Sequence, residues 1–170
     1  MRSSQSRWST VGLVFILAAC GSSTPEGKAQ ADVETPKQSD AEQAEDKIRL
    51  AIESFLKQPQ KGADARAIVN FVGESPRVMV VYRESLLSAE GSTRDLDQLM
   101  LAAFAAGNVR AQLDAGTKKD MPVEGVRALL TAYAKLKAQD PELKIAKFEE
   151  YAKHEAKGTL EAHVEALAAK

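Results

Sequence analysis

The chain has 170 residues, of which 28% are charged, and its formal net charge at pH 7 is −1. This balance offers no basic excess that would gather phosphates, so we expect no nucleic-acid partner. A single cysteine excludes an internal disulfide bond, and the length suits one domain of ordinary size.

The first 19 residues have the layout of a secretory signal peptide. Arg2 and Arg7 give a positively charged start, and residues 11–19 form an apolar run interrupted only by Gly12. This run is too short to span a membrane, because a helix needs about 20 residues to cross the hydrocarbon core. We therefore expect the segment to be removed after export.

The apolar run ends in Leu17, Ala18, Ala19, Cys20 and Gly21, which resemble the lipobox of bacterial lipoproteins. The resemblance implies that a diacylglyceryl group is attached to the Cys20 sulfur and that the chain is cleaved between Ala19 and Cys20. It also implies acylation of the new amino terminus, and several acyl chains together give a stable membrane anchor. The alternatives are an ordinary signal peptide with an Ala-Ala cleavage site, or a cytosolic protein with an apolar amino terminus.

The residue after the cysteine bears on the membrane that receives the protein. In enteric-type lipoprotein sorting, aspartate at this position retains the protein in the inner membrane, whereas this chain has Gly21. The resemblance therefore implies delivery to the outer membrane, if the host has one. Residues 20–38 contain few large apolar side chains, so we expect them to form a disordered tether before a single domain at 39–170.

Helix start and stop signals recur along residues 39–170. Ser39 and Glu42 have the spacing of a capping box, and Pro59 ends the helix that follows. The next expected helices span residues 64–73, 92–116, 120–136, 140–158 and 159 onward, with Asp-Pro at 140–141 as one of the start signals.

Residues 78–82, with the sequence VMVVY, are ambiguous. Their composition is that of a buried strand, but Ser75 followed by Pro76 is a helix start signal. A lone strand would also leave its backbone groups unpaired. We therefore expect a helix over residues 76–88, and pairing of a strand with another molecule is the alternative.

Together these elements predict an all-α fold, a compact bundle of about six to seven short helices after the tether. A helical-repeat-like stack is the alternative, because residues 136–143 faintly resemble the helix-ending segment of tetratricopeptide repeats, although no second copy follows at the required period. Most helices carry aromatic residues that we expect in the core: Phe55, Phe71, Tyr82, Phe104, Tyr133, Phe148 and Tyr151.

The sequence contains no recognisable catalytic motif, so we expect no catalytic residue, no metal and no cofactor. The two histidines are His154 and His163. Glu150 lies one turn before His154 and could share a metal ion with it, but a break at Gly158 separates the two histidines. The second histidine that a zinc-protease helix requires, four residues after the first, is also missing.

One position is unusual, because Gly107 lies within a strongly helical segment and glycine there costs about 1 kcal/mol relative to alanine. Either the helix ends at Gly107, or a neighbour packs closely on it, or Asn108 and Arg110 line a groove. Asn108 and Arg110 are accordingly the candidate ligand-binding residues.

These observations favour a lipid-anchored envelope protein that acts as a non-catalytic protein-interaction or structural module. Its partners would be the membrane, through Cys20, and another envelope protein. The alternative is a binding protein for a small apolar ligand or lipid, held in a cavity lined by Met79, Tyr82, Met100 and Phe104. An envelope enzyme with an unrecognised site is a third hypothesis.

Overall fold

The computed structural model describes residues 39–170, which form an all-α bundle of seven helices. The expected signal peptide at 1–19, the cleavage site at Ala19 and Cys20, and the tether at 20–38 lie outside the described residues. Within 39–170, no helix combines the length and the apolar character needed to cross a membrane. The helices are α1 (Asp40–Lys57), α2 (Ala63–Glu74), α3 (Glu84–Leu87), α4 (Arg94–Ala115), α5 (Pro122–Gln139), α6 (Ala146–Ala156) and α7 (Leu160–Ala168).

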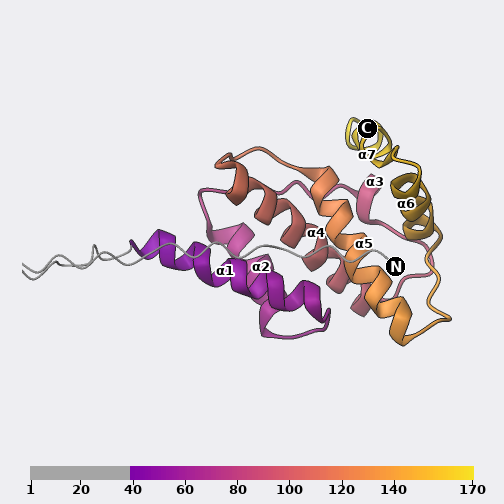
Figure 1. The fold of residues 1–170 in the computed structure, drawn as a ribbon, viewed down its shortest axis with the longest axis horizontal. Coiled ribbons are helices and arrows are strands. Elements are labelled where there is room, and N and C mark those ends of the chain that lie inside the picture. Colours follow the sequence, from indigo (N-terminus) through magenta and orange to yellow (C-terminus); the bar gives the residue numbers. More distant parts are fainter. Residues whose placement is uncertain (1–38) are drawn as a thin grey trace, which may run out of the picture. The chain divides into compact units, whose positions relative to one another are not determined.

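The long helices α4 and α5 form the centre of the bundle (Figure 1). Helices α1 and α2 pack together on one side of this pair, and α3, α6 and α7 lie on the other side. Eleven residues of α4 are buried, including the consecutive run from Ala102 to Val109, because neighbours surround this helix. The core therefore sits around α4 rather than along one stripe of each helix.

The capping box expected at the start of α1 is confirmed. The Ser39 hydroxyl accepts from the Glu42 backbone N–H at 3.3 Å, and the Ser39 backbone N–H donates to the Glu42 carboxylate at 2.8 Å. These bonds satisfy two backbone donors that a helix end leaves unpaired. From this start, α1 buries Ile48, Ile52 and Phe55.

The sequence left three explanations open for the glycine at position 107, and the structure supports the close packing of a neighbouring helix. Helix α4 continues without a break through this position. A Cβ atom on Gly107 would lie 2.2 Å from the Glu124 carbonyl oxygen and 2.5 Å from the Ala128 Cβ, both in α5. A Cβ atom on Gly125 of α5 would lie 2.7 Å from the Phe104 ring of α4. The two helices thus approach each other through a glycine on each partner.

The helix expected over residues 76–88 is wrong for most of its length. Residues 76–77 form a turn, residues 78–83 form neither a helix nor a strand, and only Glu84–Leu87 are helical. Arg83 has extended dihedral angles, and the hydrogen bonds that Met79 and Val81 both make to the bundle indicate that the chain before it is extended as well. The Ser75 hydroxyl accepts from the Arg77 backbone N–H at 3.2 Å. Ser75 and Pro76 therefore begin a single turn and not a helix. The β-branched valines at 78, 80 and 81 that follow favour an extended backbone.

The Asp-Pro signal at residues 140–141 also begins a single turn and not a helix. The Asp140 carboxylate accepts from the Glu142 backbone N–H at 3.2 Å in a turn, and α6 begins only at Ala146. The intervening chain is held by Tyr133, whose hydroxyl accepts from the Ile145 backbone N–H at 3.0 Å. The sequence-based start of this helix was therefore several residues too early.

Most of the aromatic residues are in the core, as predicted. Phe71 is half-buried and Tyr82 is 40% exposed, which departs from that prediction. The aromatic residues that are buried are Phe55, Phe104, Tyr133, Phe148 and Tyr151. The Tyr82 ring covers the buried Phe104 from outside, with ring centroids 6.3 Å apart.

Candidate functional site

The extended segment 78–82 is attached to the bundle by a glutamine side chain that acts as a substitute strand. Gln112 of α4 is fully buried. Its amide oxygen accepts from the Met79 backbone N–H at 2.9 Å, and its amide nitrogen donates to the Met79 carbonyl at 2.7 Å. A neighbouring β-strand would make this same pair of bonds, so Gln112 satisfies the backbone without a sheet.

Asp120, in the loop between α4 and α5, holds the next part of the segment. Its carboxylate accepts from the Val81 backbone N–H at 3.2 Å and from the Arg83 guanidinium at 2.6 Å. The Asn108 side-chain amide also donates to it at 2.7 Å. Asp120 is largely shielded from solvent, so its charge is compensated by Arg83 and by these neutral donors.

The opposite edge of the segment has no such partners. Because successive residues of an extended chain direct their backbone groups to opposite sides, we infer that the backbone N–H and C=O groups of Val80 and Tyr82 point away from Gln112 and Asp120. Among the described residues, the backbone N–H and C=O groups of Val80 and Tyr82 make no hydrogen bond. The segment therefore resembles the unpaired edge strand of a sheet.

The side chains of this segment add apolar surface beside that edge. Met79 is 43% exposed, Val81 37% and Tyr82 40%, and these are three of the four large exposed hydrophobic residues in the described chain. An open groove of about 530 Å³ adjoins Met79 and Arg83 on the side of Asp120, and its other lining residues are Lys119, Met121, Pro122, Val123, Glu124 and Glu165. Exposed apolar side chains gathered on one segment are typical of a surface that binds another chain.

The two residues predicted to line a ligand groove lie in different environments. Asn108 is fully buried, and its amide oxygen accepts from the Gln112 side chain at 2.5 Å and from the Met121 backbone N–H at 3.0 Å. Arg110 is exposed on the surface of α4. The hydrogen bonds of Asn108 support the extended segment and the loop before α5, and ligand binding by Asn108 and Arg110 stays a prediction.

Sequence reasoning did not identify Gln112, Asp120 and Arg83, although one signal for Gln112 was available. Gln112 lies one helical turn after Asn108, so two amides share one face of a helix whose neighbouring positions are apolar. Buried polar side chains in such a place are almost always hydrogen-bonded, so they indicate a backbone segment that needs partners. The identity of that segment could not be read from α4 alone.

The side chains with a shifted pKa mainly tie helices to one another. A hydrogen bond from Lys137 lowers the pKa of the Glu149 carboxyl most, and a second from Tyr133 lowers it further. These three groups connect α5 with α6. Burial raises the pKa of Tyr151 to about 12, and its hydroxyl donates to the Leu86 carbonyl at 3.0 Å. Hydrogen-bond partners therefore account for the shift of Glu149, and burial in the core accounts for that of Tyr151.

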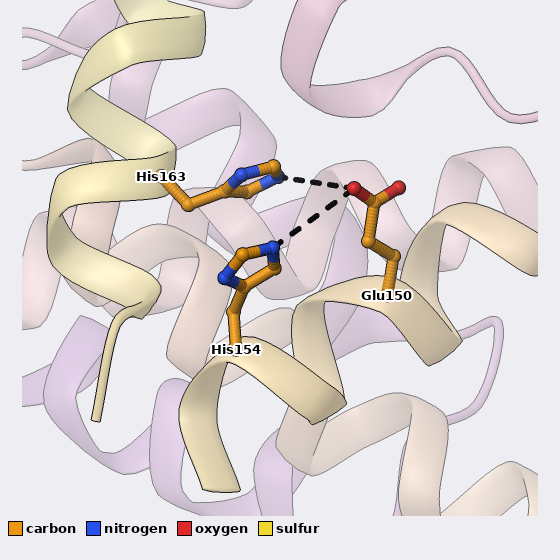
Figure 2. Close-up of side chains that lie close together, drawn as sticks. All are labelled: Glu150, His154 and His163. Atoms are coloured by element: carbon orange, nitrogen blue, oxygen red, sulfur yellow. Dashed lines mark ion pairs between the residues drawn. The ribbon is translucent and has the colours of Figure 1, made fainter. Parts of the chain in front are cut away.

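The two histidines lie together, contrary to the separation at Gly158 that the sequence suggested. Figure 2 shows His154 of α6 stacked on His163 of α7, with Glu150 of α6 beside both rings. The ring centroids are 3.9 Å apart and the ring planes differ by 15°. One Glu150 carboxylate oxygen lies 4.0 Å from Nε2 of His154 and 3.8 Å from Nε2 of His163.

This cluster forms because α7 folds back onto α6. Gly158 adopts a left-handed conformation with φ of 68°, which ends α6 and reverses the chain. The Tyr151 ring packs edge-on against His163, and their centroids are 5.8 Å apart. The turn and this aromatic contact together place His163 over His154.

Comparison of the chain with protein family models, with curated proteins and with solved structures finds no match in any of the three.

Proposed function

We propose that this chain is a lipid-anchored protein of the bacterial envelope whose helical domain, residues 39–170, is a non-catalytic module that binds another envelope protein. The anchor is supported by the lipobox-like residues 17–21, in which Cys20 would carry the acyl chains. Gly21 favours the outer membrane where the host has one. Residues 20–38 would give the module its reach above the lipid surface.

The extended segment 78–82 carries the proposal that the module binds a partner. Its inner edge is hydrogen-bonded to the bundle, while the outward backbone groups of Val80 and Tyr82 make no bond to a described residue. The occupant that satisfies such an edge is an extended segment of a second protein, which adds as a strand and places apolar side chains beside Met79 and Val81. We infer this mode of binding.

The distribution of apolar side chains supports a protein partner over a small ligand between helices. Such a ligand would need Met79, Tyr82, Met100 and Phe104 around one cavity. Met100 and Phe104 are at most 2% exposed in the packed core, whereas Met79 and Tyr82 lie on the surface. A filled interior beside an exposed apolar segment is the arrangement expected of a docking surface.

Metabolic labelling with a palmitate analogue tests the anchor. The wild-type chain should incorporate the label and fractionate with membranes, and Cys20→Ser should do neither. An unlabelled wild-type chain with a free thiol would overturn the anchor without affecting the docking surface, because the two depend on different residues.

Photo-crosslinking from single positions tests the docking surface in whole cells. A photoreactive residue at Val81 should give a discrete crosslinked product, whereas the same residue at Leu50, which is 67% exposed on α1, should not. Val80→Pro removes the outward N–H but keeps an extended backbone, so it should abolish the product at position 81 and leave folding intact. Equal products at both positions, or a product that survives Val80→Pro, would contradict strand addition.

A further inference from the structure

We propose that Glu150, His154 and His163 bind a divalent transition-metal ion of the zinc type at the contact between α6 and α7. One ligand atom from each residue can be chosen so that the three lie within 4.8 Å of one another. Glu150 and His154 share one face of α6 at a spacing of one turn, and the chain reversal at Gly158 brings His163 from α7. The three donors converge on one point of the surface (Figure 2).

The hydrogen bonds around Thr159 orient the His154 ring and engage Nδ1, which leaves Nε2 available. The Thr159 hydroxyl donates to the His154 backbone carbonyl at 3.3 Å, which uses its one hydrogen. The same oxygen lies 2.9 Å from Nδ1 of His154, so Nδ1–H is the donor in that contact when the hydroxyl hydrogen is directed at the carbonyl. In the neutral ring, Nε2 therefore carries the lone pair. Metal-binding histidines are commonly oriented by such a bond from the other ring nitrogen.

The available lone pair of His154 faces a negatively charged group. Its Nε2 lies 4.0 Å from the Glu150 carboxylate oxygen, and Nε2 of His163 lies 3.8 Å from the same atom. Lone pairs and a carboxylate oxygen repel each other at this range unless a cation lies between them. A metal ion placed between them is attracted to all three donors at once.

The distances are suitable for a small metal ion after a modest adjustment. Zinc binds histidine nitrogen and carboxylate oxygen at about 2.0–2.2 Å, so tetrahedral ligands lie about 3.4 Å apart. The observed separations, which are 3.8 and 4.0 Å from the Glu150 oxygen to the two Nε2 atoms and at most 4.8 Å within the donor set, are therefore wide. An imidazole lone pair lies in the ring plane, so binding must also tilt the two rings out of their stack. The Glu150 side chain is 58% exposed and can follow this movement.

The donor set favours a particular class of ion. Two imidazoles and one carboxylate suit zinc, copper or nickel, whereas calcium and magnesium prefer oxygen ligands alone. Three protein ligands would leave a fourth position for water. The ion would fasten α7 to α6, and α7 in turn contacts α3, where the Ser85 hydroxyl donates to the Leu167 carbonyl at 3.0 Å.

Calorimetric titration with Zn²⁺ tests the site directly. The full chain is used in a Cys20→Ser background and without a histidine tag, so that no other thiol or imidazole competes. We expect saturable binding of one ion per chain, no binding of Mg²⁺, and a zinc-dependent rise in Tm. Glu150→Gln and His163→Gln should each weaken zinc binding by at least about tenfold, as should Thr159→Val through the orientation of His154.

The controls separate the metal site from general effects on folding. Glu161→Gln changes an exposed carboxylate of α7 outside the cluster and should leave zinc affinity unchanged. Glu150 is exposed, so its variant tests the site even if His163→Gln reduces stability. The proposal is overturned if the parent chain shows no saturable zinc binding, or if Glu150→Gln and His163→Gln bind zinc as tightly as the parent.

Discussion

Opposite means hold the backbone in place in two regions, the α4–α5 pair and the extended segment 78–82. Between α4 and α5, the removal of side chains at Gly107 and Gly125 allows two helices to approach closely. In the segment, the side chains of Gln112 and Asp120 replace a missing strand. The first contact is closed and fully buried, whereas the second leaves one backbone edge available. The comparison indicates that the closely packed α4–α5 pair supports a segment whose second backbone edge has no partner among the described residues.

The largest effect is expected from Gly107→Ala. The new Cβ would lie 2.2 Å from the Glu124 carbonyl oxygen, a backbone atom that cannot move without displacing α5. We expect a loss of about 3 kcal/mol in the free energy of unfolding, measured by urea denaturation. Gly73→Ala is the matched control, because no atom lies within 4 Å of its added Cβ. It should stabilise α2 by about 0.5–1 kcal/mol, and equal losses in both variants would contradict the close approach.

Gln112→Leu should have the next largest effect. It keeps a buried side chain of similar size but removes both partners of the Met79 backbone, so we expect a loss of about 2 kcal/mol. Gln98→Leu on the exposed face of the same helix is the control and should change stability by less than about 0.5 kcal/mol. If the two variants have equal stability, Gln112 does not hold the segment.

Tyr151 gives a prediction for the dependence of stability on pH. Its pKa is about 12 in the folded chain because of burial, against about 10 in an unfolded chain. The folded state thus binds more protons between these values, so stability should be constant with respect to this group below pH 10 and fall as the pH rises toward 12.

Tyr151→Phe isolates this contribution. The variant should lose about 1 kcal/mol at neutral pH, because the Leu86 carbonyl loses its donor. Its stability should then fall less steeply than that of the wild type above pH 10, in urea titrations repeated at each pH. Parallel curves for the two proteins would show that Tyr151 does not titrate in this way.

The smallest effect on stability is expected on the open edge itself. Val81→Ser changes a side chain that is 37% exposed and leaves the backbone bond to Asp120 in place, so the loss should be within about 0.5 kcal/mol. The same variant should nevertheless weaken crosslinking from a photoreactive residue placed at Met79, which is 43% exposed on the same segment. A large loss of stability with unchanged crosslinking would assign Val81 to the fold instead.

The sequence was sufficient where a local signal and an apolar stripe agreed. Ser39 and Glu42 marked the start of α1, and Ile48, Ile52 and Phe55 marked its buried face, because both features depend on residues within a few turns. The all-α class followed from the repetition of such elements. Gly107 was recognised as unusual, but only the structure shows that Glu124 and Ala128 pack against it.

The errors arose where distant side chains decided the local structure. Ser75-Pro76 and Asp140-Pro141 each form one turn, and the chain that follows is bonded to Gln112, Asp120 or Tyr133 from another element. The sequence did not predict the histidine cluster, for a related reason. Gly158 correctly indicated the end of a helix, but a helix end does not reveal the direction in which the next helix returns.

Residue-specific amide hydrogen exchange over residues 78–82, followed by NMR, tests the central claim most directly. The Met79 and Val81 amides should exchange slowly, because they donate to Gln112 and Asp120, whereas the Val80 and Tyr82 amides should exchange rapidly. Alternating protection of this kind is the signature of an extended segment bonded on one edge. Uniform protection of all these amides, as in a continuous helix or a paired strand, would contradict the account.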